Sequence, residues 1–239
     1  MKFIWDNCKL YFDGRDLSAD LNQMELSADS EIKDATVYGS AGRRKLAGLM
    51  NVQGQFTGLY EAGSEKVDPV IWSRFAVDDK VMMVCPTDGS DGEIAYSAEG
   101  AAAQYSPLGS VGDIAAFGLT IEGSGKLIRG TIMAAGVKTA TGSGSIRQLG
   151  AVSAGQKLYL IVQVLAASVG DTLDITLNSD NLGAFGSPTL RVTVPQQTAQ
   201  GAVFMTPVDG PITDDWWRVT WTIGGVDPSF TIAVAVGIQ

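Results

Sequence analysis

The chain has 239 residues, 45% of them hydrophobic, with 17 Lys and Arg against 26 Asp and Glu, a formal net charge of −9, and no His. The absence of His removes the side chain most used for proton transfer near neutral pH, so a Ser-His-Asp or Cys-His catalytic arrangement is excluded. The acidic balance disfavours tight wrapping of nucleic acid, which requires a basic surface.

The two cysteines, Cys8 and Cys85, give no sign of a metal site. Their separation matches no zinc-finger spacing and no P-loop is present, so we expect no metal, no cofactor and no enzymatic activity. Two isolated cysteines are no disulfide framework, and we expect free thiols in a reducing compartment. No apolar run approaches the roughly 20 residues of a membrane span, and the N-terminus lacks the apolar core of a signal peptide. We therefore expect synthesis in a cytoplasm and no membrane partner.

The beginning of the chain predicts short strands that flank a long exposed segment. Strand candidates are Phe3–Trp5, Leu10–Phe12 and Leu21–Leu26. Residues 34–49, DATVYGSAGRRKLAGL, have no clean period and contain three Gly. We expect a long exposed loop or an extended arm here, and such loops are usually functional. From Met50 to Thr57 apolar and polar residues alternate, which predicts a strand.

Residues 68–76, DPVIWSRFA, predict one helix. Asp68 is a good N-cap, Pro69 suits the first helical position, and the apolar residues fall on one helical face. The two Asp-Gly pairs of residues 87–92 favour a hairpin turn over a calcium loop. Further strands are predicted at Lys80–Cys85, Glu93–Glu99, Phe117–Ile121 and Ile128–Ile132.

Residues 134–147, AAGVKTATGSGSIR, are small, polar and rich in Gly and Ser, which predicts a linker or a long turn. Beyond it, alternating segments predict an antiparallel sandwich or jelly roll. These segments are Leu158–Val164, Leu173–Leu177, Leu190–Val194, Val203–Met205, Trp217–Ile223 and Phe230–Val236. We therefore expect a mainly β chain with two domains, residues 1–133 and residues 134–239. The first contains 12 basic and 19 acidic residues and thus most of the negative charge.

Two clusters are candidates for surface contacts. The basic cluster Arg43-Arg44-Lys45 is either a docking element, with Leu46 and Leu49 inserted against another subunit, or a solvated loop tip. In the aromatic cluster Asp214-Asp215-Trp216-Trp217-Arg218, alternation predicts that Trp217 and Trp221 point inward, with Trp216 and Arg218 outward. Outward aromatic side chains on a β-sheet can stack on sugar rings, so Trp216 and Arg218 are a candidate carbohydrate contact. The simpler interpretation is that two Trp lie in the core and one lies at an interface.

The first half resembles the tail tube (major tail) proteins of long-tailed bacteriophages. The matching features run from residue 11 to about 133: the opening DGRDLSADLNQMELSAD, the loop DATVYGSAGRRKLAGLMNVQGQFTGLYEAG, the helix DPVIWSRF and the late strands DIAAFGLTIEGSGKLIRGTIM. In that family a β-sandwich carries one helix on its flank, a long loop reaches onto the next subunit, and strands from six domains join into a ring. The second half resembles C-terminal parts of similar phage proteins less specifically, as a decoration sandwich or a second tube-like domain.

The resemblance implies a structural protein of the virion tail that self-assembles into stacked rings, hexameric or trimeric and pseudo-hexameric, with other tail proteins as partners. An acidic conduit would let DNA pass without binding it. The residues expected to dock between subunits are Tyr38, Arg43, Arg44, Lys45, Leu46 and Leu49. The alternatives are a carbohydrate- or receptor-binding module of a virion, with Trp216 and Arg218 as the contact, and a capsid decoration protein.

Overall fold

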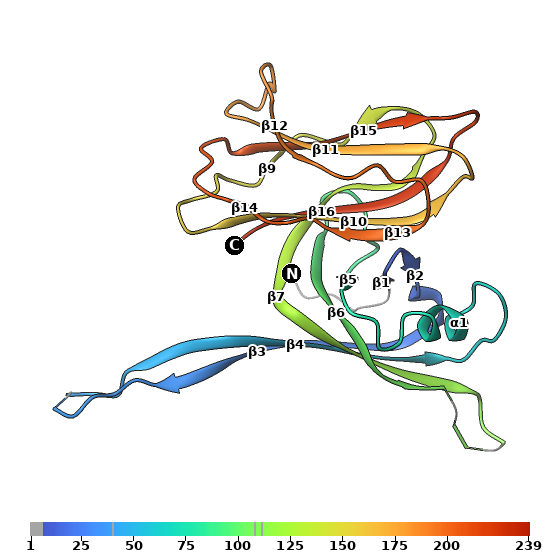
Figure 1. The fold of residues 1–239 in the computed structure, drawn as a ribbon, viewed down its shortest axis with the longest axis horizontal. Coiled ribbons are helices and arrows are strands. Elements are labelled where there is room, and N and C mark those ends of the chain that lie inside the picture. The colour runs from blue at the N-terminus through green and yellow to red at the C-terminus, as the bar shows by residue number, and fades with distance from the viewer. Residues whose placement is uncertain (1–6, 40, 108, 111) are drawn as a thin grey trace. The chain divides into compact units, whose positions relative to one another are not determined.

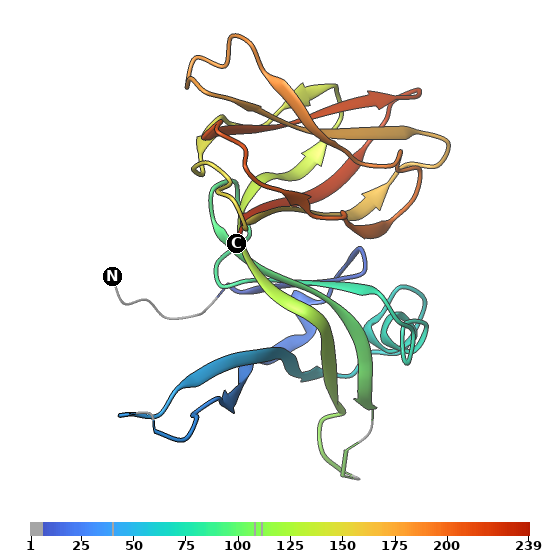
Figure 2. The same ribbon diagram turned by 60° about the vertical axis from the view of Figure 1, so that its left-hand side comes forward.

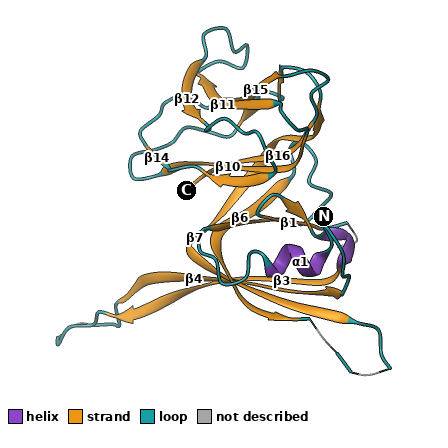
Figure 3. Ribbon diagram, turned by 45° about the vertical axis from the view of Figure 1, so that its right-hand side comes forward, coloured by secondary structure: helices purple, strands orange, loops and turns teal. Residues whose placement is uncertain are grey.

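The computed structural model describes residues 7–39, 41–107, 109–110 and 112–239, which form two compact units. Unit 1 contains the described residues up to Ala19 together with Val81–Ser97 and Ile128–Gln239, and unit 2 contains Asp20–Lys80 and Ala98–Leu127. The long strands β6 (Ile94–Ser106) and β7 (Ala116–Lys138) contribute residues to both. The chain is mainly β with one short helix, as predicted (Figure 3). The strand candidate Phe3–Trp5 lies outside the described residues.

Unit 2 is a four-stranded sheet with the helix α1 (Val67–Trp72), and its strand order is β3 (Leu21–Asp34), β4 (Lys45–Leu59), β7, β6. Alternation along β4 places Val52 and Phe56 on the buried face, where their β7 partners are Gly123 and Leu119. The helix contributes Val67, Val70 and Ile71 to the buried residues. A short 3-10 helix, Ser18–Asp20, precedes β3.

Unit 1 contains a sandwich of two antiparallel sheets (Figures 1 and 2). One sheet consists of β12 (Thr189–Thr193), β11 (Thr172–Asp180) and β15 (Trp216–Gly224), with the short strands β8 (Gly142–Ser143) and β9 (Arg147–Gln148) on β15. The other contains β13 (Gly201–Phe204), β10 (Lys157–Ala167), β16 (Phe230–Ile238) and β7, with β14 (Val208–Asp209) on β10. The predicted antiparallel sandwich of the second half is confirmed.

Strands β10 and β16 are buried on both faces, which explains their nearly uninterrupted apolar sequences. One face packs in the sandwich core with Trp217 and Val219. The other packs against residues of β1 (Lys9–Phe12) and β5 (Lys80–Cys85), including Met83. The short strand β2 (Arg15–Asp16) pairs with β1, and the buried Gln163 fixes this layer by accepting from the Gly14 N–H at 2.7 Å and donating to the Val81 carbonyl at 3.0 Å.

The predicted domain boundary between residues 133 and 134 lies inside β7, and the compact units do not separate there. The reason is that β1 and β5 cover the second face of β10 and β16. The predicted linker is also partly wrong, because Ala134–Lys138 belong to β7 and pair with β16. Of these residues, Ala134 is fully buried in the sandwich core. The two strands predicted at Phe117–Ile121 and Ile128–Ile132 are one strand, which passes through Gly125 at a φ of 96°.

The helix differs from its prediction at both ends. It begins at Val67 and ends at Trp72, and Lys66 occupies the N-cap position without a side-chain hydrogen bond. Asp68 is not the cap, because it lies inside the first turn of the helix. Its carboxylate accepts a hydrogen bond from the Tyr105 hydroxyl at 2.9 Å. No helix in the described part of the chain is long and apolar enough to span a membrane.

Candidate assembly interface

The distal part of the β3–β4 hairpin, residues 29–51, projects from the rest of unit 2 and is called the arm below (Figure 1). Strand β4 pairs with β7 from Val52 onward, so within the arm β3 and β4 pair only with each other among the described residues. Every described arm residue except Ala35 is exposed. An isolated two-stranded hairpin is at best marginally stable in water, and we infer that the arm is made to be covered.

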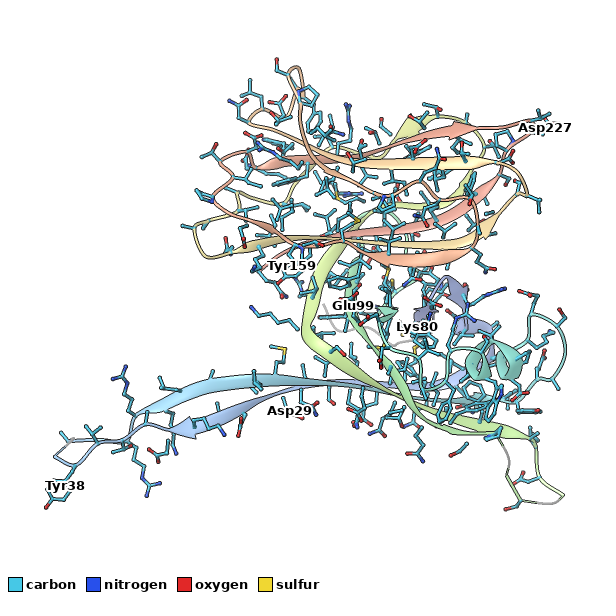
Figure 4. All side chains as sticks on the ribbon, viewed as in Figure 1. Asp29, Tyr38, Lys80, Glu99, Tyr159 and Asp227 are labelled. Carbon is cyan, nitrogen blue, oxygen red and sulfur yellow. The ribbon has the colours of Figure 1, made fainter. Side chains whose placement is uncertain are left out.

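The arm exposes large apolar side chains along its length. Tyr38, at the far tip in Figure 4, is fully exposed, and Leu49 is 83% exposed. The others are Ile32, Val37, Leu46 and Met50. A gathering of large exposed apolar side chains on one element is a candidate interaction site. Leu46 and Leu49 were among the predicted docking residues, whereas Ile32, Val37 and Met50 were missed. Their docking role stays a prediction.

A β-bulge changes which face of the arm carries apolar residues. Ser30 pairs with Met50 and Ile32 pairs with Ala47, so Gly48 and Leu49 lie opposite the single residue Glu31. Pairing therefore places Ile32 on the face of Met50, while Leu46 lies opposite Lys33 on the other face. A shallow groove at the bulge is lined by Asp29, Ser30, Glu31, Leu49, Met50 and Asn51. The arm thus offers apolar contacts on both faces, which suits insertion between two surfaces.

Polar contacts order the loop at the end of the arm. The Asp34 carboxylate accepts hydrogen bonds from the Thr36 N–H at 3.0 Å and the Thr36 hydroxyl at 2.5 Å, and the Thr36 Oγ1 accepts from the Arg44 N–H at 2.9 Å. The bond from the Thr36 hydroxyl, followed by the one from Lys45, holds the Asp34 pKa below its ordinary value of 3.8. Hydrogen bonds therefore hold the Arg44 backbone to the Asp34–Thr36 turn on the opposite side of the arm.

Two arm cations are already compensated within the arm. Lys45 forms an ion pair with Asp34 at 3.0 Å, and Lys33 forms one with Glu31. Arg43 and Arg44 are exposed and have no acidic partner among the described residues. The excess positive charge of the arm consequently resides on these two guanidinium groups, and they are available to a carboxylate on another molecule.

The sheet of unit 2 has two incompletely covered edges. Strand β3 pairs only with β4 among the described residues, so the outer edge of its 14 residues is unpaired. On the opposite edge, the thirteen-residue β6 extends beyond the six-residue β5, with a single bridge from Phe75 to Ala102. Unpaired edges are templates for pairing with another chain.

The exposed face of the same sheet is acidic. Opposite the buried face, Glu25 on β3 pairs with Gln55 on β4, and Glu122 on β7 pairs with Gln53. The Gln53 amide donates to the Glu122 carboxylate at 2.6 Å. Asp29 lies further along the same face of β3, where Figure 4 labels it. The exposed face therefore gathers carboxylates from two different strands.

The aromatic cluster of β15 is oriented as predicted, but its outer members are covered. Trp217 and Trp221 are buried, whereas Trp216 and Arg218 are only half-buried. The Arg218 guanidinium lies 4.4 Å from the Phe185 ring centroid. A Cβ added at Gly183 would lie 3.1 Å from the Trp216 ring.

The covering loop, residues 181–188, was not foreseen as a cover. Asp180 holds it in place, because its carboxylate accepts the N–H groups of Leu182 at 3.0 Å and Ser187 at 2.9 Å. Asp180 thus fixes the loop whose Gly183 lies against the Trp216 ring, and the only sequence signal was an Asp at the end of an alternating strand. A flat aromatic surface open to a sugar ring is not present on this part of β15.

Cys8 and Cys85 are present as thiols, as predicted. The Cys8 thiol donates to the Pro86 carbonyl at 3.3 Å. Burial raises the pKa of the Cys85 thiol to about 12, which keeps it protonated and unreactive at neutral pH. In the described part of the chain, no group of three or more His, Cys, Asp or Glu side chains is placed to hold a metal ion.

No family model and no curated protein matches the sequence. Among solved structures, a chain from the virion of a native gene transfer agent particle is similar at 17% identity with a TM-score of 0.41, covering 49% of this chain and 92% of that one. The Dit protein of phage SPP1, described as a hub of the adsorption apparatus, is similar at 11% identity with a TM-score of 0.38, covering 98% and 100%. A chain of the cap that terminates the tube of the anti-feeding prophage is similar at 9% identity with a TM-score of 0.42, covering 55% and 93%.

Proposed function

We propose that this protein is a structural subunit of a phage tail whose copies assemble into stacked rings that form the tail tube. The observation that carries the proposal is the arm, a projecting hairpin with apolar residues on both faces and no covering surface of its own. The resemblance of residues 11–133 to tail tube proteins leads to the same expectation. The arm of one subunit would dock on the adjacent ring.

Within a ring, the two open edges of unit 2 would complete each other. Neighbouring strands in the order β3, β4, β7, β6 run in alternating directions: β3 is antiparallel to β4 and β4 to β7, and β7 and β6 form a hairpin (Figure 1). Strand β3 of one copy would therefore meet β6 of the next in an antiparallel orientation. Repeating this contact closes a barrel, which removes every exposed edge.

The acidic face is the proposed lining of the conduit. Glu25, Asp29 and Glu122 share the face opposite the buried side of the sheet. A negative surface repels phosphate and lets DNA pass without binding. The sandwich of unit 1 is the proposed decoration, because residues 139–239 contain neither a helix nor a projecting hairpin that would repeat unit 2.

Replacing Arg43, Arg44 and Lys45 by Glu tests the proposal. All three side chains are exposed, so we expect a folded subunit with an unchanged circular dichroism spectrum that no longer forms tubes in negative-stain electron microscopy. The matched control is Lys126→Glu with Arg129→Glu, two exposed cations outside the arm, which we expect to assemble. Normal tubes from the triple variant would remove the arm from the mechanism.

The alternative of a carbohydrate-binding module has weaker support, because Phe185 and the loop around Gly183 cover Arg218 and Trp216. A glycan array with the wild type and Trp216→Ala distinguishes the two functions. Sugar binding that depends on Trp216 would favour the alternative.

A further inference from the structure

A second exposed aromatic feature lies on unit 2, away from the arm. Trp72, the last residue of α1, is 65% exposed and stacks on Phe75, with ring centroids 5.9 Å apart and an interplanar angle of 8°. Val77, Asp78 and Asp79 follow directly and are exposed. These five residues, Trp72, Phe75, Val77, Asp78 and Asp79, are called the Trp72 surface below.

The framework below the Trp72 surface is fixed. Phe75 is bridged to Ala102 of β6, and the Ala76 N–H donates to the Ala102 carbonyl at 3.1 Å. The Tyr105 hydroxyl, also on β6, donates to Asp68 in the first turn of α1. Burial and this hydrogen bond to Asp68 raise the Tyr105 pKa above its ordinary value. An exposed Trp on a fixed support has the character of an interface anchor.

The Trp72 surface carries two exposed carboxylates, whereas the arm carries two exposed guanidinium groups. Asp78 and Asp79 are exposed, and Arg74, which lies between Trp72 and Asp79, donates from Nη1 to the Val70 carbonyl and the Ser73 hydroxyl. The arm carries apolar side chains beside Arg43 and Arg44, and the Trp72 surface carries apolar side chains beside two carboxylates. The two surfaces therefore match in apolar character and carry neighbouring groups of opposite charge.

We propose that the Trp72 surface of one copy receives the arm tip, described residues 33–39 and 41–46, of a second copy. This inference rests on the proposed function and names the receiving site for the arm. The arm tip and α1 lie at opposite ends of unit 2 in Figures 1, 2 and 3, so a chain does not cover its own Trp72 with its own arm. A contact between different surfaces of identical chains is heterologous and propagates from copy to copy.

Two receiving-side variants test the contact. Trp72→Ala removes the anchor, and Asp78→Lys with Asp79→Asn reverses the local charge; Asn suits position 79, where φ is 57°. We expect each variant to keep the wild-type melting temperature and to raise the critical concentration for assembly at least tenfold, as measured by light scattering. The matched controls are Trp216→Ala and Asp91→Lys, which lie in unit 1 and should assemble normally.

Mixing gives the sharper test. Arg43→Glu with Arg44→Glu leaves the Trp72 surface intact, whereas Trp72→Ala with Asp78→Lys leaves the arm intact. An equimolar mixture then contains only one productive combination of arm and receiving surface. We expect particles of twice the mass formed by either variant alone, with no further growth, in size-exclusion chromatography with light scattering.

The outcomes separate this inference from the proposed function. Wild-type tubes with unimpaired assembly of both receiving-side variants would overturn the inference and leave the tube function standing. Open filaments that depend on Trp72 and lack a hollow core would support the contact and contradict the tube. A mixture that does not change in mass would count against the Trp72 surface as the receiver.

Discussion

At the scale of single residues, adjacent tryptophans have opposite roles because β15 alternates its faces. Trp217 is fully buried and its Nε1 donates to the Gly150 carbonyl at 2.8 Å, while Trp216 is half-buried on the outer face. Trp217→Ala should lower the free energy of unfolding by about 3–5 kcal/mol, the usual cost of emptying a large aromatic site. Trp216→Ala should cost clearly less in the same urea titration. Equal losses would mean that the two faces are wrongly assigned.

The Asp34 carboxylate makes the order of the arm loop pH-dependent. Its pKa is lowered in the folded chain, by the Thr36 hydroxyl first and Lys45 second. Because the carboxyl pKa is lower in the folded chain, the Asp34 carboxylate stabilises the folded arm at pH values above its ordinary pKa of 3.8. This stabilisation disappears as the pH falls through the lower pKa of the folded state. Amide exchange at Thr36 should therefore accelerate in that acid range. Asp34→Asn should remove the pH step, and a step that persists in this variant would assign it to another group.

At the scale of elements, the extended arm was among the predictions, whereas its strand pairing was not. Period-two alternation identifies strands because one face is buried, and it correctly predicted β5 at Lys80–Cys85 and the strands of the sandwich. In Lys45–Met50 neither face is covered, so the sequence carries no alternation and the prediction was a loop or arm rather than a paired strand. The Trp72 surface was missed for a related reason. Apolar residues at helical spacing predict a buried face, and the exposure of Trp72 does not follow from that pattern.

The arm should be dispensable for folding and required for assembly. Ala28 pairs with Val52, so residues 29–51 can be replaced by Asn-Gly, which forms a two-residue hairpin turn. The described side chains of the removed segment are exposed except for Ala35, and we expect a change in free energy of unfolding within about 1 kcal/mol. Sedimentation velocity should show no polymer. A shortened chain that fails to fold would indicate that the arm stabilises unit 2 itself.

At the scale of the whole molecule, the sequence predicted the fold class but not the grouping of segments. Residues up to Ala19 and Val81–Ser97 belong to the unit that contains the C-terminal sandwich. The nearly continuous apolar sequences of β10 and β16 indicate that both faces of these strands are covered. The sequence pattern does not indicate which strands form the second covering layer. Contacts such as Gln163 with Gly14 join residues 149 positions apart, a separation at which local pattern carries no information.

The account as a whole claims that copies of this chain complete one another's sheets. Hydrogen–deuterium exchange of the β3 amides, compared between dilute and concentrated protein, tests that claim most directly. We expect β3 and the part of β6 beyond β5 to gain protection on assembly, together with the arm. Assembled particles whose β3 amides exchange as fast as those of the dilute subunit would contradict the account.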